Sequence, residues 1–166
     1  ASEAIEFAEM AKSAGGYKVG IMVETPAIAM ALSDLAGKLD FISVGTNDLS
    51  QYLFAADRMN AGLGALLNPW QPALVRMLKV IASESEKAGI SSGVCGESAS
   101  DPAFAVVLAG LGFKSVSASR SQVGAVRSAL SAVTLEQAQQ VAEVALAATT
   151  ADQCKSVVLD ALAKLA

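Results

Sequence analysis

The sequence predicts an α/β fold in which parallel strands alternate with helices. Four short apolar runs are each followed by a segment with helical periodicity, and glycine or proline marks most of the boundaries between them. Strands that alternate with helices form parallel sheets joined by right-handed crossovers. Four strand–helix units with terminal helices amount to half of a (β/α)8 TIM barrel, and we expect this architecture for residues 1–166 as one domain.

The first half of the chain is expected to hold a leading helix and two strand–helix units. Apolar residues recur with helical spacing over 1–14, and the short apolar run at 18–24 is typical of a buried strand. Proline favours the first turn of a helix, so a helix is expected over 26–36. The run at 40–45 predicts a second strand, and residues 49–56 predict the helix that follows it.

The second half repeats this alternation after a loop. Residues 57–69 combine two glycines with an Asn-Pro pair, which predicts a long connection. Beyond it the pattern predicts a helix, a strand, a helix and a strand, over 71–88, 90–95, 101–112 and 114–118. Helical patterns fill the remainder, where Thr134-x-x-Gln137 has the spacing of a capping box. The near-continuous apolar strands predict burial on both faces of the sheet.

The composition excludes several classes of function. The chain is 53% hydrophobic and 17% charged, yet no apolar run approaches the roughly 18–20 residues that span a bilayer. No basic and apolar leader resembles a signal peptide, so we expect a cytoplasmic protein without a membrane partner. A net charge of −4 does not provide the basic surface that nucleic-acid binding requires.

The sequence has no histidine and only two cysteines. Without histidine, the sequence cannot carry a Ser-His-Asp or Cys-His catalytic group, a histidine-ligated zinc site or a phosphohistidine. Cys95 and Cys154 lack the spacing of a metal or redox motif, so we expect two free thiols. Carboxylates, arginines, lysines, hydroxyls and thiols remain for chemistry.

Three of the predicted strands end close to a residue that can do chemistry, namely Glu24, Asp48 and Cys95. The C-terminal ends of parallel strands form the functional face of such folds, so we expect these side chains to meet at one rim. Two carboxylates suit Mg²⁺, which proteins hold through one or two carboxylates together with substrate phosphates. The structural alternatives are a helix N-terminal carboxylate for Glu24 and a strand-to-helix turn for Asp48.

Neighbouring residues add groups that suit a phosphate. Gly45-Thr46-Asn47-Asp48 leads into a helix, and free backbone N–H groups at a helix start bind anions. Arg58 would offer a planar guanidinium to a phosphoryl group, or would form a surface ion pair with Asp57 instead. Cys95 is either a buried, inert cysteine or a thiol that exchanges a proton with an enolate carbon.

Four motifs occur in the order found in a known enzyme family. They are Met22-Val23-Glu24-Thr25-Pro26-Ala27, Ser43-Val44-Gly45-Thr46-Asn47-Asp48-Leu49-Ser50-Gln51-Tyr52, Asp57-Arg58 and Val94-Cys95-Gly96-Glu97. Together they resemble the phosphoenolpyruvate-binding TIM barrel of the PEP-utilising enzymes, the PEP/pyruvate superfamily. The Glu-Thr-Pro-Ala motif is most similar to the one found in the phosphoenolpyruvate–protein phosphotransferases, Enzyme I of the bacterial sugar phosphotransferase system.

The resemblance implies a role for each candidate residue. Glu24 and Asp48 are implied to be the Mg²⁺ ligands, while Asn47, Asp48 and Arg58 are implied to bind phosphoenolpyruvate or pyruvate. Cys95 is implied to be the catalytic acid that exchanges a proton with the methylene carbon of pyruvate enolate. The implied reaction transfers the phosphoryl group to a histidine outside this sequence. It starts a relay through a phosphocarrier protein that drives sugar transport.

By the same resemblance, the sequence covers the C-terminal half of the barrel. The arginines of the first half and the phosphohistidine lie outside it, so we expect this chain alone to be inactive. An open half barrel with a high apolar content is expected to self-associate as a homo-oligomer. Two alternatives are a part of a pyruvate phosphate dikinase or phosphoenolpyruvate synthase, and a catalytically inert oligomerisation scaffold.

Overall fold

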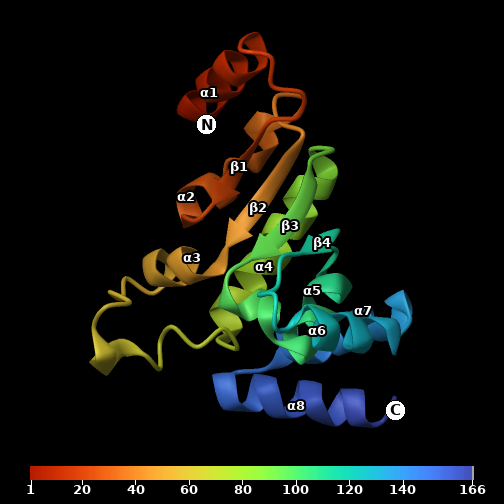
Figure 1. Cartoon of the computed structure of the whole chain (residues 1–166). Helices are drawn as coiled ribbons and strands as arrows, with labels where there is room; N and C mark the ends of the chain where they lie inside the picture. The colour runs from red at the N-terminus through yellow and green to blue at the C-terminus, as the bar shows by residue number, and fades with distance from the viewer. Residues whose placement is uncertain (166) are drawn as a thin grey trace.

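The computed structural model describes residues 1–165 and confirms the α/β class (Figure 1). The strands are β1 (Gly20–Val23), β2 (Phe41–Gly45), β3 (Ser91–Cys95) and β4 (Ser115–Val116). The longer helices are α1 (Ser2–Ser13), α3 (Thr46–Leu53), α4 (Pro72–Lys87), α5 (Pro102–Leu111), α6 (Val123–Ser131), α7 (Leu135–Ala147) and α8 (Ala151–Ala163). Shorter segments are α2 (Pro26–Ala29) and the 3₁₀ turns η1 (Leu32–Leu35), η2 (Ala61–Leu63) and η3 (Glu97–Ser100). Within residues 1–165, no helix combines the length and the apolarity that crossing a membrane would require.

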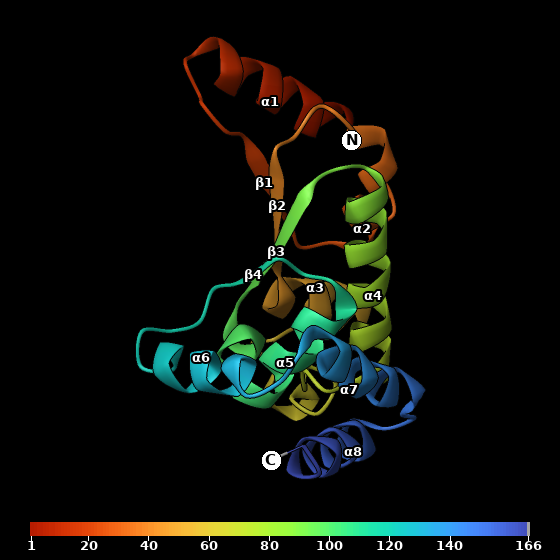
Figure 2. The ribbon, with the colours of Figure 1, turned by 90° about the vertical axis from the view of Figure 1, so that its right-hand side faces the viewer.

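The four strands form one open parallel sheet in the order β1-β2-β3-β4. Val23 pairs with Val44, and Val44 pairs with Val94, so one row of valines crosses three strands. When strand order follows chain order, successive right-handed crossovers place their helices on the same face. Figure 2 shows this arrangement, with α2 and α4 together on one side of the sheet.

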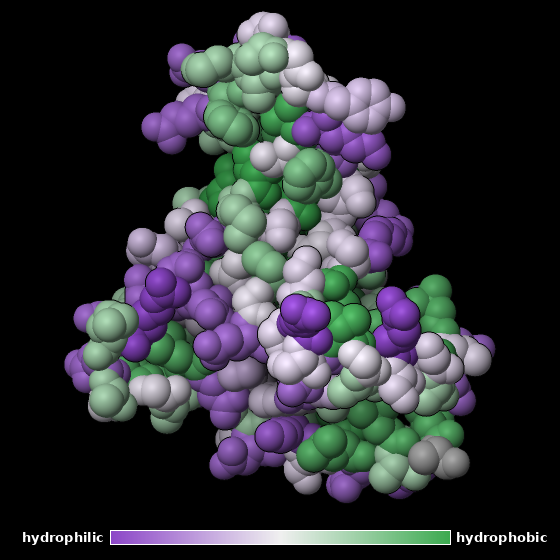
Figure 3. Space-filling view, viewed as in Figure 1, coloured by the Kyte–Doolittle hydropathy of each residue, from purple (hydrophilic) through white to green (hydrophobic). Residues whose placement is uncertain are grey.

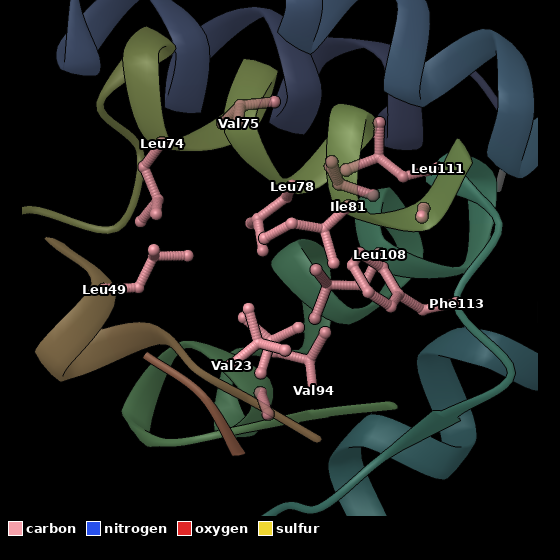
Figure 4. Close-up of a cluster of buried hydrophobic side chains, with 14 of the residues drawn as sticks. Val23, Leu49, Leu74, Val75, Leu78, Ile81, Val94, Leu108, Leu111 and Phe113 are labelled. Atoms are coloured by element: carbon pink, nitrogen blue, oxygen red, sulfur yellow. The ribbon is translucent and has the colours of Figure 1, made fainter. Parts of the chain in front are cut away.

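The core lies between that face of the sheet and the helices. Val23, Val44 and Val94 are at most 1% exposed, and they pack beneath apolar side chains of α4 and α5 (Figure 4). The labelled residues of this cluster are Val23, Leu49, Leu74, Val75, Leu78, Ile81, Val94, Leu108, Leu111 and Phe113. Burial of each such side chain stabilises the fold by about 1.5–3 kcal/mol. The core therefore fixes which face of each strand points toward the helices.

The opposite face of the sheet is uncovered over part of β1 and β2, which corrects the prediction of burial on both faces. Met22 of β1 is 46% exposed and Phe41 of β2 is 41% exposed. Figure 3 shows hydrophobic side chains at the surface around α1 and the adjoining part of the sheet. This part of the sheet is thus covered on one side only, because α2 and α4 lie together on the other side (Figure 2).

Two helices differ from their predicted bounds. The helix expected over 26–36 is only α2, and the chain then tightens into η1, where Leu32 and Leu35 are both buried. Residues three apart share one side of a 3₁₀ turn, so this tightening brings both leucines to the core. The helix expected over 49–56 begins earlier, as α3, directly after β2. The capping box at Thr134 and Gln137 is confirmed at the start of α7.

Helices α5 and α7 approach closely at Gly110. A Cβ atom at this position would collide with the carbonyl oxygen of Ala138. Gly124 of α6 offers a contrast, since a Cβ there would meet nothing within 4 Å.

We expect Gly110→Ala to lower the free energy of unfolding by about 1–3 kcal/mol, because the added methyl must separate two packed helices. The control, Gly124→Ala, should raise it by up to about 1 kcal/mol, since alanine is the better helix former. Urea denaturation followed by circular dichroism measures both. Equal effects of the two substitutions would contradict this account of the contact between α5 and α7.

Candidate functional site

The C-terminal ends of β1, β2 and β3 lie side by side. Gly45 is paired with Cys95 in the sheet, and Glu24 follows Val23, the partner of Val44. Because side chains alternate along a strand, these three positions face away from the valine row and the helices. Glu24, Gly45 and Cys95 therefore form one row across the sheet.

Gly45 leaves room for the side chain of Glu24. A Cβ atom at Gly45 would lie 2.5 Å from Oε1 of Glu24, so the carboxylate occupies the volume that any larger residue would fill. Glu24 is partly buried. A carboxylate therefore rests over the end of β2, with a thiol on the next strand.

The segment Thr46-Asn47-Asp48 forms the first turn of α3. Gly45 occupies the N-cap position and offers no side-chain oxygen to the first backbone N–H groups. These N–H groups remain available to an anion, and the helix dipole favours negative charge at this end. Asn47 is exposed and Asp48 is partly exposed, so both side chains can reach a ligand.

Asp48 and Arg58 are in direct contact. Nη1 of Arg58 lies 3.2 Å from Oδ1 of Asp48 and 3.3 Å from Oδ2, and both side chains remain partly exposed. The backbone N–H of Arg58 donates a hydrogen bond of 3.0 Å to Gln51, which ties the loop to α3. Arg58 thus pairs with Asp48 and not with the alternative partner Asp57, whose Oδ1 accepts the backbone N–H of Met59 at 2.9 Å.

The two cysteines lie in different surroundings. The thiol of Cys95 is partly buried and lies 3.4 Å from the carbonyl oxygen of Val44, to which it donates. Cys154 of α8 is fully buried, and burial raises the pKa of its thiol. Both thiols are free, as the sequence predicted, and Cys154 is part of the core, while Cys95 lies at the strand ends.

A hollow of about 440 Å³ opens beside the start of α3 and does not include Glu24, Asp48 or Cys95 in its lining. It is lined by Asn47, Arg58, Met59, Leu67 and Glu97. A second hollow of about 210 Å³ shares three of these residues. The hollow of about 410 Å³ between α7 and α8 is of similar size but contains no candidate residue.

Glu97 and Leu67 were not singled out from the sequence. Glu97 closes the motif that contains Cys95, and this position was the available signal for it. Leu67 lies in the loop over 57–69, where nothing in the pattern indicates that it would line a site. Within residues 1–165, no group of three or more histidine, cysteine, aspartate or glutamate side chains is arranged to hold a metal ion. Any cation at this rim would therefore be held by at most two such side chains together with other ligands.

Comparison with known proteins gives a consistent result. Residues 2–135 match the family described as PEP-utilising enzyme, PEP-binding domain. The chain is 40% identical, over 93% of its length, to a phosphoenolpyruvate-protein phosphotransferase of Streptomyces coelicolor. It is 39% identical, over 81% of its length, to the protein of that name in Mycoplasma genitalium. It is also 40% identical, over 83% of its length, to a protein of the phosphoenolpyruvate-dependent phosphotransferase system of Salmonella typhimurium.

The matched relatives are much longer than this chain. The chain spans 28% of the Streptomyces protein, 23% of the Mycoplasma protein and 18% of the Salmonella protein. The similarity therefore concerns one part of each relative.

Proposed function

Since the chain belongs to the family of PEP-utilising enzymes, whose PEP-binding domain it matches, we propose that it binds phosphoenolpyruvate as part of a phosphoenolpyruvate–protein phosphotransferase. The observation that carries this proposal is the contact between Asp48 and Arg58 beside a hollow that Asn47 lines. In the complete reaction the phosphoryl group passes to a histidine outside this chain and then to a phosphocarrier protein. The chain alone is not expected to complete that transfer.

Arg58, Asn47 and the start of α3 are the proposed phosphate contacts. A guanidinium presents a planar pair of donors that matches two oxygens of a phosphoryl group. Arg58 and Asn47 line the same hollow, and the first turn of α3 adds uncapped N–H groups. In the chain without ligand, Arg58 is paired with Asp48, so phosphate binding would exchange one anionic partner for another.

Glu24 and Asp48 are the proposed ligands of Mg²⁺. Both offer carboxylate oxygens, the donors that this ion prefers, and Glu24 rests in the space that Gly45 leaves open. These features fit a divalent cation held by two carboxylates and completed by substrate and water. When bound, such an ion stabilises negative charge on the phosphate and enolate oxygens. Asp48 would then turn its carboxylate from Arg58 toward the cation.

Cys95 is the proposed acid. After the bond between phosphorus and the enol oxygen breaks, the methylene carbon of pyruvate enolate takes the thiol proton, and the thiolate regains a proton from solvent. The chain has no histidine for this role. What supports this role is the position of Cys95 at the strand end that pairs with Gly45, the residue that directly precedes α3.

We further infer that the four strands are half of a (β/α)8 barrel and that copies of this chain associate. The consecutive strand order agrees with that fold. The two open sheet edges and the exposed side chains of Met22 and Phe41 give it an apolar surface to cover. Sedimentation that shows only monomer at micromolar concentration would contradict the association.

Asp48→Asn should abolish the increase in phosphoenolpyruvate affinity that Mg²⁺ produces, because the substitution removes a charged ligand at constant shape. Isothermal titration with and without Mg²⁺ measures the effect. Asp34→Asn, which removes the same charge from an exposed position of η1, is the matched control and should behave as the unmodified chain. Metal-dependent binding that survives in Asp48→Asn would exclude Asp48 as a ligand.

Arg58→Ala should weaken phosphoenolpyruvate binding by about tenfold to a hundredfold, the range for a lost hydrogen bond to a charged group. Pyruvate lacks the phosphoryl group, so its affinity should not change. Arg127→Ala, at an exposed position of α6, is the control for loss of an arginine. A parallel loss of affinity for both ligands would assign Arg58 a structural role.

Cys95→Ala should leave Mg²⁺-dependent phosphoenolpyruvate binding intact. In the full-length protein, we expect it to abolish exchange of the methyl protons of pyruvate with deuterated water, because the exchanging thiol is gone. Proton NMR measures the exchange, and calorimetry measures the binding. If binding is lost together with exchange, the thiol supports the structure instead of donating a proton.

A further inference from the structure

A buried pair of hydroxyl groups joins the ends of β2 and β3. Oγ1 of Thr46 lies 2.7 Å from Oγ of Ser98, and these residues are 1% and 2% exposed. Thr46 also donates to the carbonyl oxygen of Cys95 at 3.1 Å. Thr46 precedes Asn47 in α3, and Ser98 belongs to η3, just after Cys95. We call these two residues the hydroxyl bridge.

The contacts of the hydroxyl bridge fix the direction of its hydrogen bonds. A threonine hydroxyl has one proton, and the carbonyl oxygen of Cys95 can only accept. Thr46 therefore gives its proton to Cys95, and Ser98 must give its own proton to Thr46. The result is a short relay of donors that ends on the backbone of the residue proposed as the acid. Buried polar groups are expensive to leave unpaired, so loss of one member strains the others.

Gly96 lies where the ends of β2 and β3 are in close contact. Its φ of 96° lies in the region that favours glycine. A Cβ atom there would lie 2.7 Å from Oγ1 of Thr46 and 3.3 Å from Oδ1 of Asn47. The turn that follows Cys95 thus lies directly against both residues. Space and hydrogen bonding act together to set the distance between the thiol-bearing strand and the start of α3.

We propose that Thr46 and Ser98 are positioning residues that hold Cys95 in register with Asn47 and Asp48. The assignment of Cys95 as the acid and of Asn47 and Asp48 as ligand-binding groups rests on the proposed function. The hydroxyl bridge acts on Cys95 through its backbone carbonyl and on Asn47 through the chain itself. Its consequence is measurable without substrate, as the accessibility of the Cys95 thiol.

The two cysteines provide the probe for this test. Iodoacetamide alkylates thiolates, and mass spectrometry reports the rate at each cysteine separately. Cys154 is fully buried, and burial raises the pKa of its thiol, so its labelling reports global unfolding. Cys95 is partly exposed, so its labelling reports the strand ends. A local change accelerates labelling of Cys95 alone, whereas loss of the fold accelerates both.

Thr46→Val keeps the shape and removes the hydroxyl, and we expect labelling of Cys95 to rise by about tenfold with Cys154 unchanged, as loss of a buried hydrogen bond implies. Thr46→Ser keeps the hydroxyl and should restore the original rate. Ser98→Ala should accelerate the labelling of Cys95 in the same way. Ser85→Ala is the matched control, since it removes another buried serine hydroxyl, bonded within α4 to Ile81, and should leave Cys95 unchanged.

Labelling of Cys95 at the original rate in Thr46→Val, with Cys154 still protected, would overturn the proposal. If Thr46→Val labels both cysteines rapidly, Ser98→Ala decides. Faster labelling of Cys95 alone in Ser98→Ala then supports the role of the hydroxyl bridge, and an unchanged labelling rate of Cys95 overturns it. Equal acceleration in Ser85→Ala and Ser98→Ala would also overturn it.

The same labelling with phosphoenolpyruvate and Mg²⁺ tests the proposed function separately. Protection of Cys95 in the unmodified chain supports substrate binding at this rim. Absence of protection would count against the substrate, while acceleration in Thr46→Val without any ligand would still establish the hydroxyl bridge as a positioning contact for Cys95.

Discussion

The register of the parallel sheet is the constraint on which the rest of this structure depends. Val23, Val44 and Val94 form a row that is buried under α4 and α5. A shift of one residue in any of these strands would turn its valine to the uncovered face and would turn the residue next to it in sequence toward the core. The packing of apolar side chains on one face therefore decides what appears on the other.

The site follows from that register. Because side chains alternate, the residues just after the valine row must point to the uncovered face, and these are Glu24, Gly45 and Cys95. The middle position has no side chain, which leaves room for the carboxylate of Glu24. Helix α3 then begins at once after Gly45, so Asn47 and Asp48 reach the rim from the first helical turn instead of from a loose loop. The candidate site is thus carried by strand ends and a helix.

The electrostatics of the rim favour exchange of partners over permanent pairing. Asp48 and Arg58 neutralise each other across 3.2 Å, yet both remain partly exposed to water. An exposed ion pair contributes little to stability, so little is lost when a ligand separates the two side chains. The buried contacts behave differently, because Thr46 and Ser98 are almost fully shielded from solvent and the loss of a buried hydrogen-bond partner is costly. The rim thus combines an exposed ion pair that a ligand can separate with a buried hydrogen bond between the ends of β2 and β3.

The sequence by itself determined the alternation of strands and helices, the four strands and the residues at their ends. Local periodicity, proline and glycine positions, and the motifs around Glu24, Asp48 and Cys95 carry that information. The helix predicted from residue 26 was too long, and the helix predicted from residue 49 began too late. Both errors arise because the burial of Leu32, Leu35 and Thr46 depends on contacts that local patterns do not contain. Only the tertiary structure decided that Arg58 pairs with Asp48 rather than with Asp57, that Glu97 and Leu67 line the hollow, and that Thr46 meets Ser98. The contact between Thr46 and Ser98 joins segments that the sheet brings together, whereas the pair of Asp48 and Arg58 forms because the loop after α3 folds back onto that helix.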